Sequence, residues 1–423
     1  MHPEPARPVW HSVPVRARGA VARLSCALAL VSVAACADDP APRVPVVQWA
    51  TPPDRADLTP LADACTEAAG GSYRIEIETL PDDVGLRRIE ILDRLRARDG
   101  SIDLVGVDTS LTTELAEADL LAPLPEEVLS SLDGSTRPEA LAASTVGDTV
   151  ATAPWWYEPY LLWYRGSLAE RAGLDVTAPI TWDELITATA RLGGTLQIAD
   201  ADGLGTSAWL TGLVASAGGD VVTDLDSAAG EQAAAVVRLY ADARIGPGPS
   251  PDSLAAFAGP TGAFLVAPAS VEADPELAIV SAELSSTGYP VIDPSTAAAP
   301  LTGVGLAVPR GATDPAAAFE AITCLTSAES AERLADLTGH TPAQRTGDEV
   351  VLAPDADPVD LPDPRADVVG DALAGGVPEP AVAQFDAFRR SVDDRWSPVT
   401  AVVGATPART AAEIRSALAG DLR

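Results

Sequence analysis

The 423-residue sequence contains no lysine, a single methionine, 3 histidines and 4 cysteines, and only 4% of its residues are aromatic. All 28 basic residues are therefore arginines, and they are outnumbered by 61 acidic residues. Without lysine the chain can form neither a Schiff base nor a P-loop phosphate cradle. The net charge of −33 and the absence of a basic stripe with interleaved aromatics exclude a nucleic-acid binder.

The hydrophobic content and the length indicate a folded chain with more than one core. Hydrophobic residues make up 47% of the sequence, which is too many for a disordered chain. A chain of 423 residues exceeds what one ordinary core organises. We therefore expect two lobes.

The first 43 residues have the pattern of a lipoprotein export signal. Four arginines precede an apolar run at residues 24–35, which at 12 residues is too short to span a membrane. The run ends in Val-Ala-Ala before Cys36, which is similar to a bacterial lipobox. We predict a signal peptide at residues 1–35, lipid attachment at Cys36, a tether at residues 36–43, and anchoring on the extracytoplasmic face of the cell membrane. An ordinary secreted protein is the alternative.

The two remaining cysteines form an even pair in a chain that is predicted to be exported. Cys65 and Cys324 both fall in helix-like segments, and oxidising compartments favour disulfides. We predict a disulfide between them. Two buried free thiols are the alternative, because sequence spacing alone does not fix the distance between two cysteines.

The segment after the tether alternates strand-like and helix-like runs, which predicts an α/β architecture. The expected elements are strands at residues 44–49, 73–77 and 102–107 and helices at residues 58–69 and 86–95. Leu86, Ile89, Leu92 and Leu95 are expected on one apolar face of the second helix, with Arg87 and other charged residues mostly around it. Asp108 follows the third strand, at the sheet edge where ligands gather in α/β folds. Its carboxylate accepts ligand hydroxyls, or it caps the helix that follows.

Other local patterns mark helix starts and loops. Thr181 and Glu184 have the spacing of a capping box, and the glycines at 203 and 205 permit a helix entry. We expect a helix over residues 209–217, a loop at 246–252, a solvated connector at 355–367 and a terminal helix at 406–422.

An aromatic run is the most unusual feature of the chain. It contains Trp155, Trp156, Tyr157 and Glu158 in succession. Aromatic faces stack on sugar rings, while carboxylate, indole and phenol groups bond to hydroxyls. In an extended chain Trp155 and Tyr157 share one side, and Trp156 and Glu158 share the other. We predict that all four, together with Trp209, line a ligand cleft; an aromatic core between lobes is the alternative.

Catalytic and metal-binding motifs are scarce. His340 is the only histidine after the predicted signal peptide, no G-x-S-x-G elbow accompanies it, and too few His and Cys remain for a zinc site. We expect no cofactor, no metal and no enzymatic activity. Two carboxylates that meet in space would still suffice for glycoside hydrolysis, so that alternative stays open.

A series of motifs in a fixed order resembles a known family. The motifs are the lipobox, Trp-Ala-Thr-Pro-Pro-Asp at 49–54, Asp-Leu-Val-Gly-Val-Asp at 103–108, Glu-Leu-Ala-Glu-Ala at 114–118, Leu-Leu-Trp-Tyr-Arg at 161–165, Thr-Trp-Asp-Glu-Leu at 181–185, Ser-Ala-Gly-Gly at 216–219 and Ala-Phe-Glu-Ala-Ile-Thr-Cys-Leu at 318–325. Over residues 44–345 the sequence resembles the carbohydrate-type solute-binding lipoproteins of ABC importers, most nearly trehalose-binding lipoproteins of the mycobacterial type.

This resemblance implies a two-lobe periplasmic-binding-protein-like fold of type II, with a hinge and a ligand cleft between the lobes. The lobes would comprise residues 44–154 with 302–345, and residues 155–301 with 346–423. The resemblance also places Cys65 and Cys324 on helices of one lobe, and it puts Asp108 and Gly303 at the cleft. It implies a sugar or polyol ligand and an ABC permease as the partner.

Some positions differ from the trehalose-binding pattern. Glu158 stands in place of an Asn, Pro268 stands near the place of a stacking Trp, and no arginine is evident around residues 375–377. The ligand therefore stays open. A lipoprotein of the same fold that binds a protein partner or acts as a sensor is the alternative function.

Overall fold

A computed structural model describes residues 44–200, 202–296, 298–345 and 364–420. The predicted signal peptide, the tether with Cys36 and most of the 355–367 connector lie outside the described residues. Within the described ranges, no helix combines the length and the apolar character that crossing a membrane would require.

The first part of the chain forms the expected βαβαβ unit. Its elements are β1 (Val46–Thr51), α1 (Thr59–Ala68), β2 (Arg74–Thr79), α2 (Val84–Ala97) and β3 (Leu104–Asp108). The strands are parallel in the order β2-β1-β3, so the carboxyl ends of β1 and β3 lie at one edge of the sheet. This edge presents Asp108 and the loop after β1 on the same side.

The remaining elements follow in chain order. Up to residue 258 they are α3 (Thr109–Glu117), α4 (Glu126–Leu132), α5 (Pro138–Ala143), β4 (Thr145–Val146), β5 (Thr149–Val150), β6 (Ala153–Arg165), α6 (Gly166–Ala172), α7 (Trp182–Leu192), β7 (Thr195–Ala199), α8 (Gly205–Ser216), α9 (Ala228–Ala243), β8 (Pro249–Ser250) and α10 (Ser253–Ala258). After that they are β9 (Gly262–Pro268), η1 (Ala269–Ala273), η2 (Pro275–Glu283), β10 (Leu284–Thr287), β11 (Pro300–Ala307), α11 (Pro315–Leu325), α12 (Ala328–Thr338), α13 (Pro364–Ala374), β12 (Val377–Pro378), α14 (Phe385–Trp396), η4 (Val399–Ala401) and α15 (Thr406–Leu418).

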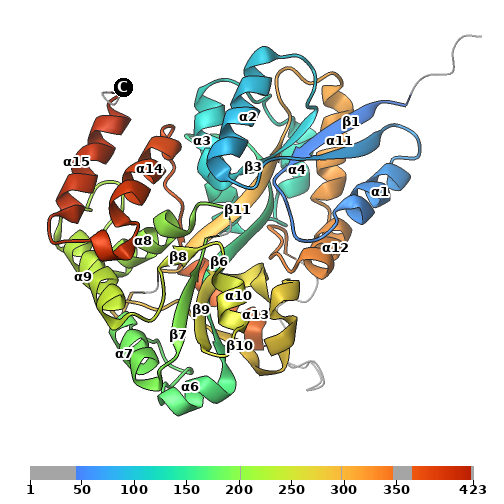
Figure 1. Cartoon of the computed structure of the whole chain (residues 1–423). Helices are drawn as coiled ribbons and strands as arrows, with labels where there is room; N and C mark the ends of the chain where they lie inside the picture. Colours follow the sequence, from blue (N-terminus) through green and yellow to red (C-terminus); the bar gives the residue numbers. More distant parts are fainter. Residues whose placement is uncertain (1–43, 201, 297, 346–363, 421–423) are drawn as a thin grey trace, which may run out of the picture. The chain divides into compact units, whose positions relative to one another are not determined.

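The long strand β6 joins two halves of one sheet, and Figure 1 shows it near the centre of the described chain. The strand order is β2-β1-β3-β11-β6-β9-β7-β8. The first half of β6 pairs with β11, with Pro159 opposite Leu301. From Tyr160, opposite Pro268, its partner is β9. One continuous strand therefore pairs with β11 in one half of the sheet and with β9 in the other. The sheet contains both parallel and antiparallel pairs, so the fold is a mixed α/β fold.

Several local predictions are confirmed. Thr181 and Glu184 form both hydrogen bonds of the capping box at the start of α7. Helix α8 begins at Gly205, and α15 begins at Thr406 but ends at Leu418 rather than residue 422. The predicted loop at 246–252 contains one short strand, β8, because its backbone pairs with β7.

The predicted buried face of α2 is confirmed at Leu92 and Leu95, which are 3% and 4% exposed, and wrong at its N-terminal half. Leu86 and Ile89 are 59% and 52% exposed, whereas Arg87 is only 2% exposed. The arginine faces inward because a carboxylate at the end of β3 neutralises it there. Arg87 therefore lies on the buried face of α2 together with the apolar residues Val84, Ile91, Leu92 and Leu95.

The disulfide Cys65–Cys324 is confirmed. It joins α1 to α11 with a Cα–Cα distance of 5.8 Å and a sequence separation of 259 residues. Cys65 belongs to a core cluster that also contains Trp49, Trp155 and Ile322. The bond thus fastens two distant segments of the chain across one shared core.

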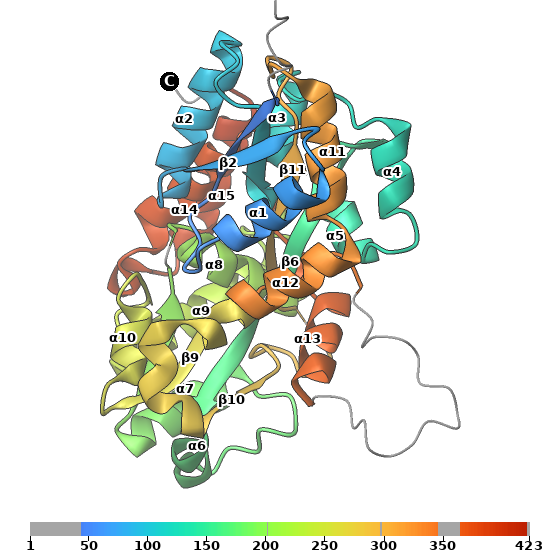
Figure 2. The same ribbon diagram turned by 90° about the vertical axis from the view of Figure 1, so that its right-hand side faces the viewer.

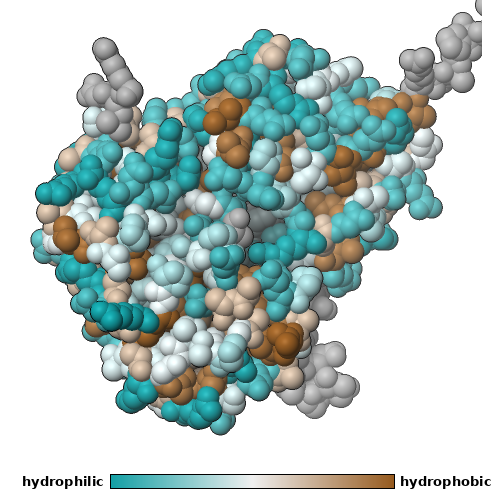
Figure 3. Space-filling view, in the orientation of Figure 1, coloured by the Kyte–Doolittle hydropathy of each residue, from teal (hydrophilic) through white to brown (hydrophobic). Residues whose placement is uncertain are grey.

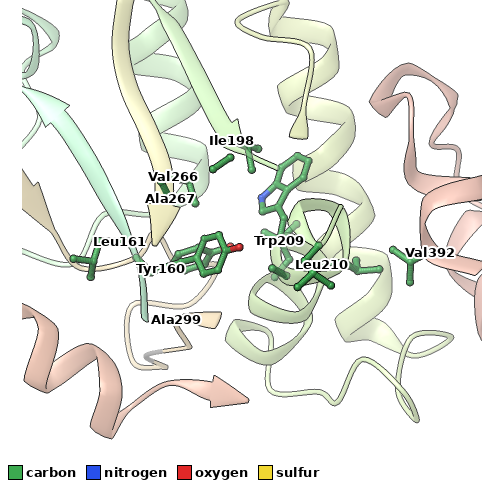
Figure 4. Packing of buried hydrophobic residues seen from close by; sticks show 14 of the residues in the cluster. Tyr160, Leu161, Ile198, Trp209, Leu210, Val266, Ala267, Ala299 and Val392 are labelled. Carbon is green, nitrogen blue, oxygen red and sulfur yellow. The ribbon is translucent and has the colours of Figure 1, made fainter. Parts of the chain in front are cut away.

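The other half of the sheet has its own large core. Figure 4 shows Trp209 of α8 in this cluster beside Ile198 and Leu210. The C-terminal helices α14 and α15 pack on α8 and α9, as Figures 1 and 2 show. Outside these cores, Figure 3 shows hydrophilic side chains over most of the viewed face, with hydrophobic ones scattered between them.

Candidate functional site

A cleft of about 480 Å³ lies where the edge of the first half of the sheet meets β6 and β9. The loop after β1, the end of β3, the inward residues of β6 and β11, the turn from β9 into η1, and the residues after α12 all contribute to its walls. A volume of this size is typical of a site for a small molecule. The carboxyl end of β3 supplies Asp108, as expected for an α/β sheet.

Asp108 forms a buried, two-pronged ion pair with Arg87. The Nε and Nη2 atoms of the arginine donate to the two carboxylate oxygens at 2.8 and 2.9 Å. Burial works against the charge of Arg87, but the carboxylate of Asp108 outweighs it and holds the pKa of the arginine above its ordinary value. Asp108 occupies the N-cap position of α3 without a side-chain capping bond. Its side chain is therefore fixed by Arg87 rather than by the helix.

Glu158 lies on β6 and is paired with the only histidine of the described residues. His340 Nδ1 lies 3.2 Å from Glu158 Oε1, and its Nε2 lies 3.0 Å from Asp54 Oδ2. The hydroxyl of Ser270 also donates to Glu158 Oε1, at 2.7 Å. An imidazolium that donates from both ring nitrogens fits between these two carboxylates.

The two carboxylates set the charge of the histidine. Burial alone would lower the pKa of His340, but the charge of Glu158 and the hydrogen bond with Asp54 raise it to about 9. Burial works to raise the pKa of Asp54, yet the hydrogen bond and charge of His340 hold it below its ordinary value. At neutral pH the histidine is therefore a cation.

The aromatic run divides between the cleft and the core, as its alternation predicts. Trp156 lines the cleft and stacks on His340, with ring centroids 3.9 Å apart and planes 4° from parallel. Trp155 and Tyr157 are each 2% exposed and belong to two core clusters instead. Their prediction as cleft residues is wrong, because strand alternation sends only one face of β6 to the cleft.

Two further predicted residues also lie outside the cleft wall. Trp209 is 3% exposed and packs against Trp182 and Tyr240 in the core. Gly303 stands between two lining residues of β11, but its own position faces β6. A Cβ there would meet Tyr157 Cδ2 and Trp156 O at 2.5 Å, so the glycine allows the two strands to approach.

Acidic side chains dominate the polar lining. Six carboxylates line the cleft: Asp54, Asp82, Asp108, Glu158, Asp202 and Asp274. Three cationic groups oppose them: Arg55, Arg87 and His340. Arg55 pairs with Asp274, so each cation already faces at least one carboxylate. The cleft therefore keeps an excess of negative charge.

Burial shifts the pKa of the acidic groups around Tyr160. Burial raises the pKa of Asp202 to about 6, and burial raises the pKa of Glu379 to about 8. Glu379 follows β12 and accepts a hydrogen bond from Thr109 at 2.7 Å. Burial, followed by the charges of Asp202 and Glu379, raises the pKa of Tyr160 well above 10. Tyr160 therefore offers the cleft a neutral hydroxyl.

Sequence reasoning identified Asp108, Trp156 and Glu158 of this wall and missed their partners. Arg87 was predicted to lie beside the apolar face of its helix, and His340 was considered only for catalysis or a zinc site. The only available signal was that His340 is the single histidine in 380 residues that follow residue 43. Among the described residues, no three His, Cys, Asp or Glu side chains are grouped so that they could hold a metal ion.

Solved structures of solute-binding proteins share this fold. The maltose-bound MalE3 of T. maritima is 19% identical, with a TM-score of 0.71 over 88% of this chain and 99% of its own. A solute-binding protein of Thermotoga lettingae with bound α-D-tagatose is 17% identical, with a TM-score of 0.73 over 88% and 100%. UgpB of Mycobacterium tuberculosis, in complex with glycerophosphocholine, is 18% identical, with a TM-score of 0.70 over 86% and 95%. The chain thus has the two-lobe fold of periplasmic binding proteins.

A family profile covers most of the described chain. Residues 51–332 match the family described as "Bacterial extracellular solute-binding protein". The match begins at the last residue of β1, includes α1 through α11, and contains Asp108, Trp156 and Glu158 of the cleft. The chain therefore belongs to the bacterial extracellular solute-binding protein family.

Proposed function

We propose that the protein is the solute receptor of an ABC importer, that it captures a sugar or other polyol in the cleft, and that it delivers this ligand to a membrane permease. Binding, not a chemical step, would be its activity. The proposed place of action is the extracytoplasmic face of the membrane, with the lipid on Cys36 as the anchor. The family membership and the sugars named for the T. maritima and Thermotoga lettingae structures support the proposal.

The observation that carries the proposal is the combination of polar and aromatic groups in one cleft of about 480 Å³. Asp108 and Glu158 are held rigidly by their cationic partners. Each carboxylate oxygen has a second lone pair, so both can still accept ligand hydroxyls. Trp156 adds an aromatic wall, and Thr302 and Tyr160 add hydroxyls.

We further propose that the lobes comprise residues 44–154 with 302–345 and residues 155–301 with 346–423, and that they close over the ligand. The change of partner along β6 supports a division within this strand, although the strand leaves β11 and joins β9 at Pro159 and Tyr160, five residues after the proposed boundary. Hinge closure of this kind couples ligand capture to the surface that a permease contacts.

A ligand screen tests the function directly. Full-length protein in detergent is heated in the presence of mono- and disaccharides, polyols, amino acids and short peptides. A ligand that binds only the folded state raises the melting temperature by mass action. We expect a saturable increase with one sugar or polyol, confirmed by calorimetry.

A matched pair of variants ties that binding to the cleft. Thr302 lies on β11 between Asp108 and Glu158 and lines the cleft, so Thr302→Val is expected to lower affinity roughly five- to tenfold by removing one hydroxyl. The control is Ser285→Ala on the exposed side of β10. A flat screen with a cooperative melt would contradict the receptor function and favour the partner-binding alternative. Turnover of nitrophenyl glycosides would favour the enzyme.

A further inference from the structure

The charge of the cleft remains unbalanced after every ion pair is formed. Arg87 compensates Asp108, Arg55 compensates Asp274, and one His340 is shared by Asp54 and Glu158. Asp82 and Asp202 line the same cleft without an ion-pair partner among the described residues. Three negative charges in the walls therefore lack a protein cation.

One carboxylate of the cleft, Glu158, is buried with one of its two oxygens lacking a hydrogen-bond donor among the described residues. Glu158 is 1% exposed, and its Oε1 receives the bonds from Ser270 and His340. Its Oε2 is buried and has no hydrogen-bond partner among the described residues. A buried carboxylate oxygen without a hydrogen-bond donor costs free energy, so a ligand that donates a hydrogen bond at this point would be favoured.

Asp202, a second carboxylate of the cleft, lacks an ion-pair partner among the described residues. The loop that carries it reaches α2, where the backbone N–H of Val84 donates to the carbonyl oxygen of Asp202 at 2.9 Å. The carboxylate itself accepts only the N–H of Leu204, at 3.2 Å, among the described residues. The guanidinium of Arg87 is nearby, but its Nε and Nη2 atoms both donate to the carboxylate of Asp108.

From this arrangement we infer that the ligand is a sugar or polyol that carries a positive charge, such as an amino sugar, and that Glu158 and Asp202 select the charge. The inference rests on the proposed function and names its ligand class. A neutral hydroxyl could fill the position at Glu158 Oε2, but it would leave three negative charges in a cleft from which binding expels water. An ammonium group supplies the donor and also compensates one of these three charges.

The same charges exclude an anionic ligand. A phosphate or carboxylate would need free cationic donors, and all three cations of the cleft already face carboxylates. It would also meet the uncompensated acids as like charges. The preference is therefore expected to run from cation to neutral molecule to anion.

Matched ligand sets test this order. Full-length protein in detergent is titrated calorimetrically at pH 7 with three series. These are glucose, glucosamine, N-acetylglucosamine and glucuronic acid; galactose, galactosamine and N-acetylgalactosamine; and trehalose with its monoamine. The N-acetyl sugars keep the nitrogen substituent but lose the charge. We expect the amine to bind about tenfold more tightly than its neutral relatives at about 20 mM salt, with a smaller preference at about 300 mM.

Two variants locate the preference. Glu158→Gln and Asp202→Asn each remove one charge while keeping the side-chain shape, and each is expected to reduce the preference for the amine at least about threefold. Glu117→Gln, on the exposed end of α3, is the control and is expected to leave the preference unchanged. Thermal melts check that each variant is folded.

The outcomes separate the two proposals. A neutral sugar that binds as tightly as its amine, without salt dependence, would overturn the charge inference and leave the sugar-receptor function standing. A preference for the amine that survives both cleft variants would overturn the assignment to this site. Binding of no member of any series would overturn both the ligand class and the sugar-receptor function.

Discussion

The cleft compensates its two central carboxylates in different ways. Asp108 at the end of β3 faces a guanidinium that is always charged, and the pair is only 21 residues apart in sequence. Glu158 on β6 faces an imidazole that can lose its proton, from a residue 182 positions away. Both acids flank β11, opposite Val304 and Thr302.

The difference separates a fixed end of the cleft from a titratable one. Arginine keeps its charge at every pH at which the protein is folded, so the Asp108 end is expected to stay unchanged with pH. An imidazole can lose its proton, and the pKa of His340 is about 9 in the folded protein, so the Glu158 end is expected to change at alkaline pH. Similar carboxylates in one cleft thus acquire different sensitivities from their partners alone.

Removing the fixed partner has the largest expected effect. Arg87→Ala leaves Asp108 buried without its cation, and we expect the free energy of unfolding to fall by about 3–5 kcal/mol. Urea denaturation measures this change. Arg333→Ala, in the exposed pair with Glu329, is the control and should lower it by less than about 1 kcal/mol. Equal decreases in the free energy of unfolding of the two variants would show that the Arg87–Asp108 pair behaves like an exposed ion pair.

The two faces of β6 provide the next test, because only one of them belongs to the Glu158 end. Trp155→Ala empties a core position and is expected to lower the free energy of unfolding by about 3–5 kcal/mol. Trp156→Ala is expected to lower it less and to weaken ligand binding about tenfold. Melts and calorimetry with the ligand from the screen distinguish them. If Trp155→Ala weakened ligand binding and Trp156→Ala did not, the cleft would lie on the Trp155 face of β6 instead.

The pH dependence of stability should report on the titratable end. The pKa of His340 is about 9 in the folded protein against about 6.5 unfolded. Its stabilisation is therefore complete below about pH 6.5 and is lost as the pH rises through about 9, by on the order of 1–3 kcal/mol. Denaturation at a series of pH values measures the slope, and His340→Gln should reduce it.

Glu379 must be separated from this effect, because burial raises its pKa to about 8. Because the folded protein binds the proton of Glu379 more tightly than the unfolded chain, Glu379 also adds to the free energy of unfolding at low pH. This contribution is lost as the pH rises from about 4.5 through about 8. Glu379→Gln removes this part and leaves the His340 slope between about pH 6.5 and 9. An unchanged slope in His340→Gln would contradict the charge assigned to the histidine.

The smallest expected effect concerns the neutral support of Glu158. Ser270→Ala removes the 2.7 Å hydrogen bond to Glu158 Oε1 and should lower the free energy of unfolding by about 1 kcal/mol. Urea denaturation measures it against Ser285→Ala, which removes an exposed hydroxyl of β10. A loss as large as that of Arg87→Ala would mean that the serine, rather than the histidine, is the main partner.

Local patterns predicted much of the fold. The βαβαβ start, the capping box at Thr181 and the disulfide between Cys65 and Cys324 all follow from short-range periodicity, hydrogen-bonding rules or the pairing of scarce residues. The burial of Arg87 on α2 did not follow, because its ion-pair partner Asp108 lies on another element. The aromatic run predicted the alternation of β6 but not which face would meet the cleft.

The sequence by itself determined the elements, the carboxylate at the end of β3 and the presence of aromatic side chains beside Glu158, because neighbours along the chain decide these features. Only the tertiary structure decided which acids are paired. His340 meets Glu158 and Asp54 across 182 and 286 residues, so no local pattern could reveal their contact. The excess charge of the cleft is a sum over segments from both halves of the sheet, and it exists only once folding has brought them together.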